Sequence, residues 1–261
     1  MTWIYALANQ KGGVGKTTTA ISLGACLAEQ GQKVLLVDAD PQANATSSLG
    51  LDKNDITDTI YGTLLEENSL SDAILRSDRF KLSLVPSSPD LAGVEVELVS
   101  QVGREFRLQR ALLGLVNRYD YVLIDCPPSL GLLTVNALVA ATDGVIIPIQ
   151  CEYLALEGLS QLTKTLDLVR THLNPALSIR GLLMTMYDGR TNLAQQVVDE
   201  VRGHFGGLVF RSVVPRSVRL SEAPSHGEPI LYYAPRSAGA LAYWALSEEI
   251  LRVDGGSIEG E

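Results

Sequence analysis

A short run of glycines, lysines and threonines constrains the fold more than any other feature of this chain. Residues 10–19 read Gln-Lys-Gly-Gly-Val-Gly-Lys-Thr-Thr-Thr and lie between an apolar stretch at 4–8 and a helix-like segment at 17–30. A glycine-rich turn between a strand and a helix directs backbone N–H groups at an anion, and the helix N-terminus adds a partial positive charge. The pattern therefore predicts a loop that holds the phosphates of a nucleoside triphosphate.

Two side chains of this loop, Lys16 and Thr17, are the candidates for phosphate and metal chemistry. We expect Lys16 to reach the β- and γ-phosphates and the Thr17 hydroxyl to coordinate Mg²⁺. The remaining nucleotide contacts of the loop are expected from Lys11, Gly12, Gly13, Val14, Gly15 and Thr18.

The loop departs from the usual pattern G-x-x-x-x-G-K-[ST], because Gln10 stands where that pattern has glycine, and Lys11 follows it. Without further information, Lys11 would be interpreted as a solvated charge on the loop. The sequence K-G-G-V-G-K-T-T, however, resembles the deviant Walker A motif of the ParA/MinD class of P-loop ATPases. The resemblance implies that Lys11 crosses a dimer interface to the partner's nucleotide. Two ATP molecules would then lie between two subunits, and association would depend on ATP.

Two apolar stretches, 34–37 and 121–124, each end in an acidic residue. Such runs suit parallel strands that are buried on both faces and carry polar residues at their carboxyl ends, where ligands bind. Asp40, just after the first stretch, is expected to orient or polarise the attacking water, and Asp125 to hold Mg²⁺ directly or through a water. The alternative for Asp40 is a turn or helix-capping role before Pro41.

Strand-like and helix-like segments alternate along the chain. This alternation favours right-handed crossovers and predicts an α/β fold, a doubly wound, mostly parallel sheet flanked by helices, as in P-loop NTPases. Residues 50–80 are the least regular, and we expect an insertion or a pair of short helices there. The expected strands are 4–8, 33–38, 81–85, 121–125, 144–149, 179–186 and 208–214, and the expected helices are 17–30, 90–117, 130–141, 155–172, 192–204 and 239–252.

Length and composition fit one sizeable domain. A chain of 261 residues with 46% hydrophobic content can bury a large core. We expect a single P-loop ATPase domain over residues 1–253 and a flexible acidic tail over 254–261. No stretch approaches the roughly 18 consecutive apolar residues of a membrane span, and no signal peptide precedes the first strand. A cytoplasmic location is therefore predicted.

The three cysteines, Cys26, Cys126 and Cys151, are too scattered for a disulfide framework or a zinc site. We interpret them as small apolar side chains of the core. Iron-protein reductases of the same P-loop class bridge a cluster with cysteines, but the spacing here does not follow their pattern. The three histidines have no metal-like spacing either.

A second resemblance, to the ParA/Soj chromosome- and plasmid-partitioning family, spans nearly the whole chain. It implies a slow, Mg²⁺-dependent ATP hydrolase whose ATP-bound dimer binds double-stranded DNA without sequence preference, and so a nucleoid-associated protein. A ParB/Spo0J-like centromere-binding partner would stimulate hydrolysis and release the dimer, and the cargo would be either a chromosome or a plasmid. The motifs that carry it are Ala-Asn-Gln-Lys-Gly-Gly-Val-Gly-Lys-Thr-Thr at 8–18, Val-Asp-Ala-Asp-Pro-Gln at 37–42, Ile-Asp-Cys-Pro-Pro at 124–128, Met-Tyr-Asp-Gly-Arg-Thr at 186–191, and Val-Pro-Arg-Ser-Val-Arg-Leu-Ser-Glu-Ala-Pro-Ser at 214–225.

The partitioning resemblance also implies further site residues. Arg190 and Arg219 would contact DNA, and Arg216 would either join them or lie by the nucleotide. Near the adenine ring it places Met186, Pro215 and Ser217. Relatives commonly have asparagine at the position of Ser217, and a hydroxyl supplies one donor where an amide supplies two, so this contact would be weaker.

The overall charge of −9 opposes DNA binding, which is mostly phosphate neutralisation by lysine and arginine. Residues 180–236, however, hold seven arginines against five acids. A dimer would double such a patch, so that two weak sets of contacts would bind usefully together. The alternative for each of these arginines is an ordinary solvated or locally paired surface charge.

Two other functions compete with this interpretation. A MinD-like membrane-associated positioning ATPase needs a C-terminal helix with a lysine- or arginine-rich face, whereas helix 239–252 has an acidic margin and should pack on the protein's own sheet. A P-loop small-molecule phosphotransferase needs an acceptor pocket beside the γ-phosphate. No motif for such a pocket is evident, and Lys11 would have no role.

Overall fold

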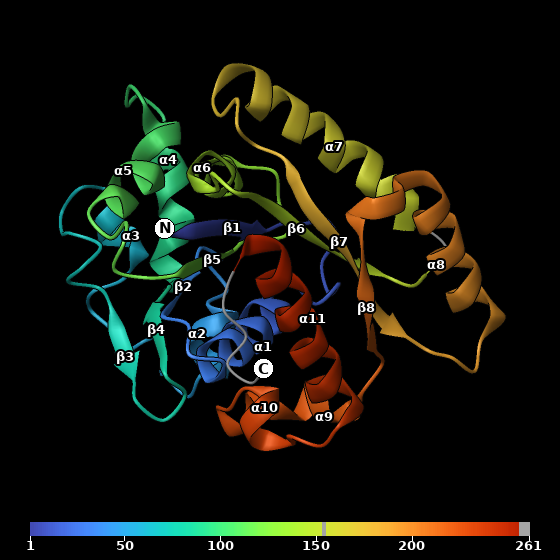
Figure 1. Cartoon of the computed structure of the whole chain (residues 1–261). Helices are drawn as coiled ribbons and strands as arrows, with labels where there is room; N and C mark the ends of the chain where they lie inside the picture. The colour runs from blue at the N-terminus through green and yellow to red at the C-terminus, as the bar shows by residue number, and fades with distance from the viewer. Residues whose placement is uncertain (153–154, 256–261) are drawn as a thin grey trace.

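One eight-stranded sheet organises the computed structural model, which describes residues 1–152 and 155–255 (Figure 1). The strand order is β3-β4-β2-β5-β1-β6-β7-β8; β3 pairs antiparallel with β4, and all other pairs are parallel. This confirms the predicted fold class. The strands are β1 (Trp3–Leu7), β2 (Val34–Asp38), β3 (Leu75–Ser77), β4 (Leu82–Val85), β5 (Tyr121–Asp125), β6 (Gly144–Gln150), β7 (Ile179–Tyr187) and β8 (Val209–Pro215).

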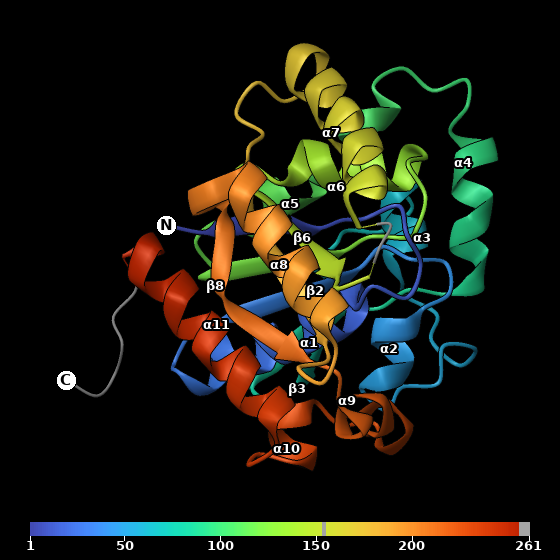
Figure 2. The same cartoon turned by 90° about the vertical axis from the view of Figure 1, so that its right-hand side faces the viewer.

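Helices cover both faces of the sheet, because successive side chains of each strand point to opposite faces and both sets are apolar. In β1, Ile4 and Ala6 join one core cluster, and Tyr5 and Leu7 join the other. Figures 1 and 2 show α6 and α7 on one side of the sheet and α1 and α11 on the other. The helices are α1 (Lys16–Glu29), α2 (Asn44–Ser48), α3 (Ile60–Leu64), α4 (Val94–Glu97), α5 (Arg107–Leu113), α6 (Leu132–Ala140), α7 (Ala155–His172), α8 (Asn192–Phe205), α9 (Val218–Glu222), α10 (Ile230–Tyr233) and α11 (Ala238–Asp254).

The predicted helix over residues 90–117 is wrong. The chain instead forms a 3₁₀ turn (Pro89–Gly93), α4, a second 3₁₀ turn (Arg104–Phe106) and α5. Gly103 has a φ of +71°, a left-handed conformation that ends regular helix and that glycine adopts without a steric penalty. In the irregular region 50–80, only α3 is an α-helix, and β3 was not predicted because a three-residue strand is too short to show alternation.

The C-terminal helix α11 packs on the protein's own sheet, as expected, and buries Tyr243, Leu246 and Ile250. The predicted tail begins at Asp254, which is the last residue of α11. The buried carboxylate of Asp254 accepts a hydrogen bond from the Tyr5 hydroxyl at 2.9 Å. Residues 256–261 of that predicted tail lie outside the described residues. Within the described part of the chain, no helix combines the length and apolar character needed to cross a membrane.

Candidate functional site

The loop between β1 and α1 lies at the carboxyl edge of the sheet and exposes its backbone amides. Gly13 and Gly15 have φ values of +72° and +91°, which side chains other than glycine rarely adopt. Gly15 caps α1 without any side-chain hydrogen bond to the first turn. The free N–H groups of that turn are therefore available to an anion.

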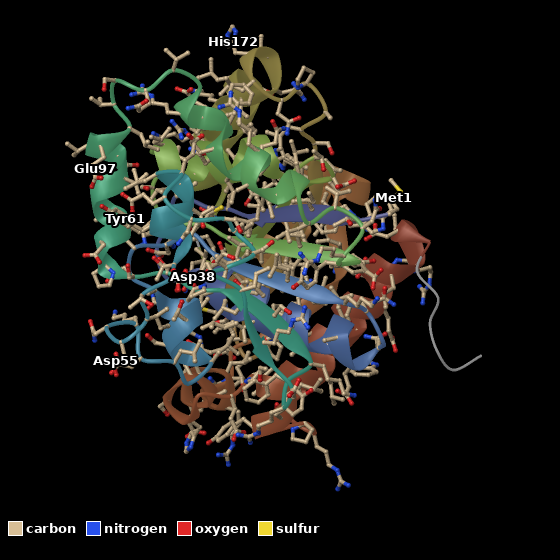
Figure 3. All side chains as sticks on the ribbon, turned by 90° about the vertical axis from the view of Figure 1, so that its left-hand side faces the viewer. Met1, Asp38, Asp55, Tyr61, Glu97 and His172 are labelled. Carbon is tan, nitrogen blue, oxygen red and sulfur yellow. The ribbon has the colours of Figure 1, made fainter. Side chains whose placement is uncertain are left out.

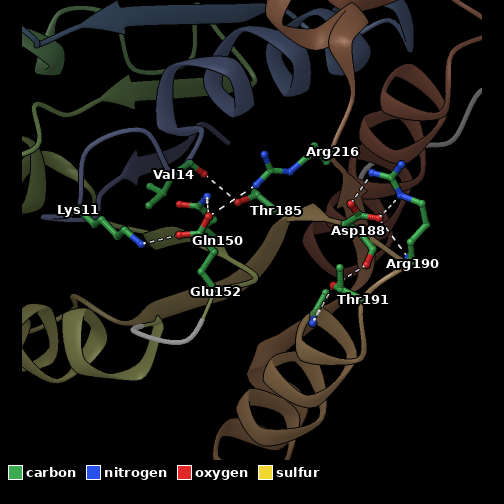
Figure 4. A network of polar contacts seen from close by, with 10 residues as sticks. Lys11, Val14, Gln150, Glu152, Thr185, Asp188, Arg190, Thr191 and Arg216 are labelled. Atoms are coloured by element: carbon green, nitrogen blue, oxygen red, sulfur yellow. Dashed lines mark hydrogen bonds and ion pairs between the residues drawn. The ribbon is translucent and has the colours of Figure 1, made fainter.

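Two residues that sequence reasoning did not assign hold this loop in place. The Asn9 side-chain amide donates to the Pro148 carbonyl at 2.8 Å, and its oxygen accepts from the Lys11 N–H at 3.0 Å. From β7, the Thr185 hydroxyl donates to the Val14 carbonyl at 2.8 Å (Figure 4). These bonds tie the loop to β6 and β7, so the loop has a defined shape without a ligand.

Lys16 is a buried cation that has no carboxylate hydrogen-bond partner among residues 1–152 and 155–255. Its side chain is at the start of α1, the residue is 7% exposed, and Nζ donates only a long hydrogen bond of 3.4 Å to the Lys11 carbonyl. Burial lowers the pKa of Lys16, and the nearby carboxylates of Asp125 and Asp40 oppose this shift. An ammonium group in such surroundings gains from a bound anion, because the charged form is otherwise poorly solvated.

Asp125 is a buried acid of the same site. It ends β5, and neither of its carboxylate oxygens has a hydrogen-bond partner within the described part of the chain. Burial raises the pKa of Asp125 well above its usual value, the adjacent charge of Asp38 raises it further, and the Thr17 hydroxyl lowers it in part. Buried polar atoms are nearly always satisfied, so an orphaned carboxylate fits a site for a cation.

Asp38 is a residue of this site that sequence reasoning missed. It ends β2 directly beside Asp125 in the sheet register, and its Oδ2 accepts hydrogen bonds from the Thr46 N–H at 2.8 Å and the Thr46 hydroxyl at 2.7 Å. Burial raises the pKa of Asp38 to about 6, against the lowering effect of these bonds. The signal in the sequence was its position, because Asp38 ends its strand just as Asp125 does. The sequence analysis predicted only Asp40 as a site residue in this segment.

Asp40 lies at the turn after β2 and is 5% exposed. Its Oδ1 accepts a hydrogen bond from the Gln42 N–H at 2.9 Å, which is the turn contact named as its alternative role. Asp40 also lines a hollow of about 370 Å³ at the glycine loop, so the turn contact and a role at the phosphates are compatible. The lining residues are Gly12, Gly13, Gly15, Lys16, Thr17, Thr18, Asp40, Gln42, Asn44, Ser48, Pro128 and Pro224.

A second hollow of about 230 Å³ adjoins the first and shares Gly15, Thr18 and Pro224 with it. Met186, Pro215 and Ser217, the three residues expected near the adenine ring, all line this hollow, together with Arg216 and Tyr243. Met186 has a φ of +52°, which is uncommon for a residue with a side chain and marks a constrained turn at the end of β7.

Lys11 points away from the first hollow in the single chain. Its Nζ pairs with Glu152 Oε2 at 3.3 Å, and the other oxygen of Glu152 lies 3.6 Å from Arg216 (Figure 4). Glu152 follows β6, and no sequence motif had singled it out. It brings together two cations that sequence reasoning assigned to separate roles.

The three arginines expected to contact DNA are each paired with an acid of this chain. Arg190 NH2 lies 2.7 Å from Asp188, and Arg219 NH1 lies 2.9 Å from Glu222 (Figure 4 for Arg190). Arg216 pairs with Glu152. The Arg190 guanidinium lowers the pKa of Asp188 to about 2, so this pair is ionised at neutral pH. The positive charge of these arginines is therefore locally offset.

The cysteines are buried and are expected to be unreactive. Burial raises the pKa of the Cys26 thiol to about 12 and that of the Cys151 thiol to about 11. Burial also raises the pKa of the Cys126 thiol. Because the thiolate is the reactive form, Ellman's reagent at pH 8 should react at least ~10²-fold more slowly with the native protein than with the urea-unfolded chain. A rapidly modified thiol in the native protein would contradict this prediction.

Comparisons with known proteins agree with this arrangement. The AAA domain family matches residues 2–179. Sporulation initiation inhibitor protein Soj of Bacillus subtilis (strain 168) is 56% identical over 95% of this chain and 97% of its own length. Chromosome partitioning protein ParA of Myxococcus xanthus (strain DK1622) is 56% identical over 96% of this chain and 88% of its own. A crystal structure of cobyrinic acid a,c-diamide synthase from Mycobacterium smegmatis with bound ADP and magnesium superimposes with a TM-score of 0.87, at 42% identity, over 98% of this chain and 96% of that one.

Proposed function

The chain belongs to the AAA domain family and, within it, to the Soj/ParA family of chromosome partitioning ATPases, and from this premise we propose that it is a DNA-partitioning switch. In this proposal the protein binds ATP and Mg²⁺, forms a dimer around two nucleotides, and binds double-stranded DNA in that state without sequence preference. Slow hydrolysis, stimulated by a ParB-like partner, then releases the dimer. The observation that carries the proposal is the orphaned carboxylate of Asp125 beside the buried Lys16 at an open glycine loop.

The nucleotide would lie across the two adjoining hollows. The loop amides and Lys16 would bind the phosphates, and the base would enter the hollow lined by Met186, Pro215 and Ser217. Asp125 and Thr17 would hold Mg²⁺, which offsets the charge of the phosphates. No cluster of three or more metal-ligating side chains occurs among the described residues, in keeping with a Mg²⁺ ion that takes few protein ligands and completes its shell with phosphate oxygens and water.

The ion pair between Lys11 and Glu152 gives the dimer step a physical basis. In the single chain Lys11 is directed at Glu152 rather than at the hollow of its own subunit. Both partners are about half exposed, so breaking their pair costs little. In our proposal Lys11 exchanges Glu152 for the phosphates of the nucleotide in the partner subunit, where the denser negative charge favours it.

DNA binding in this proposal requires two subunits because each arginine is already paired. A DNA phosphate must compete with Asp188 for Arg190 and with Glu222 for Arg219. The gain per arginine is therefore small, and two aligned sets are needed for useful affinity.

The experiment that tests the proposal measures binding to a duplex oligonucleotide by fluorescence anisotropy with ATP, with ADP and without nucleotide, at low and moderate salt. We expect binding only with ATP, weakening with salt. Arg219→Ala should weaken it by about tenfold. The matched control is Arg170→Ala on α7, because Arg170 pairs with Asp167 at 2.7 Å in the same i,i+3 geometry. Binding that ignores the nucleotide, or an equal loss in the control, would contradict the proposal.

A second substitution, expected to strengthen DNA binding rather than weaken it, makes this test more specific. Asp188→Asn removes the charge that offsets Arg190 and should tighten ATP-dependent DNA binding by roughly threefold to tenfold. Asp167→Asn is the control and should leave the affinity unchanged. If Asp188→Asn weakens binding, Arg190 acts through its present pair with Asp188 and not as a DNA contact.

The second candidate is a small-molecule enzyme, which the 42% identity to a structure named as a synthase favours. The identity to the two partitioning proteins is higher, at 56%. ATP binding and hydrolysis without any DNA binding in the anisotropy experiment would favour this candidate.

A further inference from the structure

A basic hollow of about 340 Å³ lies at the end of the sheet opposite to the glycine loop. It opens between the amino ends of β2 and β5 and the β3–β4 hairpin. In Figure 3 the hairpin faces the viewer, and Asp38 and Met1 mark the carboxyl and amino ends of the central strands on opposite sides of the view. No acidic residue among those described lines the hollow. The lining residues are Lys33, Val34, Arg76, Lys81, Ser83, Arg118 and Tyr119.

The four cations come from three separate segments that regular backbone contacts hold together. The Lys33 carbonyl accepts hydrogen bonds from the N–H groups of Asp120 at 2.8 Å and Tyr121 at 3.1 Å. Arg76 lies opposite Ser83 in the antiparallel register of β3 and β4. Lys81, with a φ of +54°, directly precedes β4 at the end of the hairpin turn. Arg76 thus lies within a strand, and Lys33, Lys81 and Arg118 lie in the short connections that lead into β2, β4 and β5.

The positive charge of the hollow is largely uncompensated. Lys81 alone has a carboxylate partner, Glu29 at 3.1 Å, and Arg118 donates only a long hydrogen bond of 3.4 Å to the Ser71 hydroxyl. The nearby Asp120 carboxylate is engaged by the Lys33 backbone N–H at 2.8 Å. Neither Lys33 nor Arg76 has a side-chain partner within the described part of the chain. The hollow therefore gathers four cations in a protein whose net charge is −9.

We propose that this hollow is a second anion site, which binds a small molecule carrying two or more phosphate groups. Arginine matches phosphate oxygens with its planar fork, and lysine supplies a point charge. The volume falls in the range of small-molecule pockets, roughly 300–1,000 Å³. A concave site closed by a hairpin suits a compact anion better than a convex DNA duplex. The site is separate from the nucleotide site, because the two lie at opposite ends of the parallel strands.

The test uses inorganic tripolyphosphate without magnesium, titrated by calorimetry into the Lys16→Ala variant, so that binding at the glycine loop is disabled. We expect one saturable site in this background. Adding Arg76→Ala and Arg118→Ala together should weaken binding by at least about tenfold. Both arginines are exposed, so the variants should fold, and thermal unfolding checks this. The matched control is Arg79→Ala, an exposed arginine of the same hairpin that pairs with Glu228 and does not line the hollow.

The control should change the affinity by less than about twofold. Three results would overturn the proposal: no saturable binding of tripolyphosphate in the Lys16→Ala background, unchanged binding in the Arg76→Ala and Arg118→Ala variant, or an equal loss in Arg79→Ala, which would indicate general charge attraction only. A short duplex oligonucleotide is titrated in parallel. Binding of the duplex without binding of tripolyphosphate would also overturn it.

Discussion

Replacing Lys16 with alanine is expected to lower kcat/KM for ATP hydrolysis by at least ~10³-fold, because phosphoryl transfer depends mainly on charge stabilisation by preorganised groups. Lys16 is the buried cation closest to the proposed phosphate site, and in the described structure its ammonium has only a long hydrogen bond to a backbone carbonyl. Among the described residues that line this hollow, Lys16 is the only cation. Release of inorganic phosphate, followed over a range of Mg²⁺-ATP concentrations from well below KM to saturation, measures the effect.

The control for this variant is Lys164→Ala, which removes an exposed lysine on α7 and should leave the rate unchanged. Because burial lowers the pKa of Lys16, its charge is unfavourable in the folded protein without ligand, and the alanine variant should unfold at a temperature no lower than the wild type. A Lys16→Ala protein that hydrolyses ATP within tenfold of the wild-type rate would refute the assignment.

Replacing Asp40 with alanine is expected to slow hydrolysis by roughly 10²- to 10³-fold while leaving ATP-dependent dimers intact. Asp40 lines the same hollow as Lys16 and is almost fully buried, so it can orient a water next to the phosphates. Nothing in its contacts holds the glycine loop or the base. Size-exclusion chromatography with ATP and a phosphate-release assay measure the two properties separately.

The Asp40→Asn variant separates the catalytic role of Asp40 from its role in the turn. An asparagine oxygen can still accept the hydrogen bond from the Gln42 N–H, now 2.9 Å from Asp40 Oδ1, but it carries no charge. If Asp40 acts on the water through its charge, the asparagine variant is as slow as the alanine variant. If the asparagine variant hydrolyses ATP at the wild-type rate, Asp40 serves the turn alone.

The sequence was most informative where a function depends on local backbone geometry. The glycine-rich run predicted a tight turn between the first strand and the first helix, and Gly13 and Gly15 in that turn have positive φ values. The apolar run that ends at Asp125 predicted a buried strand with its acid at the carboxyl end, and Asp125 is indeed the last residue of β5. Both features are encoded within a few consecutive residues. They can therefore be predicted without knowing which other segments of the chain pack against them.

Predictions failed where short elements depend on their surroundings. The expected helix over 90–117 divides at Gly103, and β3 exists only because its three residues pair with β4 at the edge of the sheet. Asp38 was not predicted as a site residue, although it ends its strand just as Asp125 does. Only the register of β2 with β5, which places Asp38 next to Asp125, shows that it shapes the charge of the site.

The sequence by itself determined the α/β class, the phosphate loop and the strand that positions Asp125, because periodicity and glycine content act over short distances along the chain. The tertiary structure alone decided which charges face one another. It paired Lys11 with Glu152 and Arg190 with Asp188, left the Asp125 carboxylate without a hydrogen-bond partner among the described residues, and gathered Lys33, Arg76, Lys81 and Arg118 around one hollow. Coulomb energies depend on distances in space, and the order of strands in the sheet sets those distances for residues that are far apart in sequence.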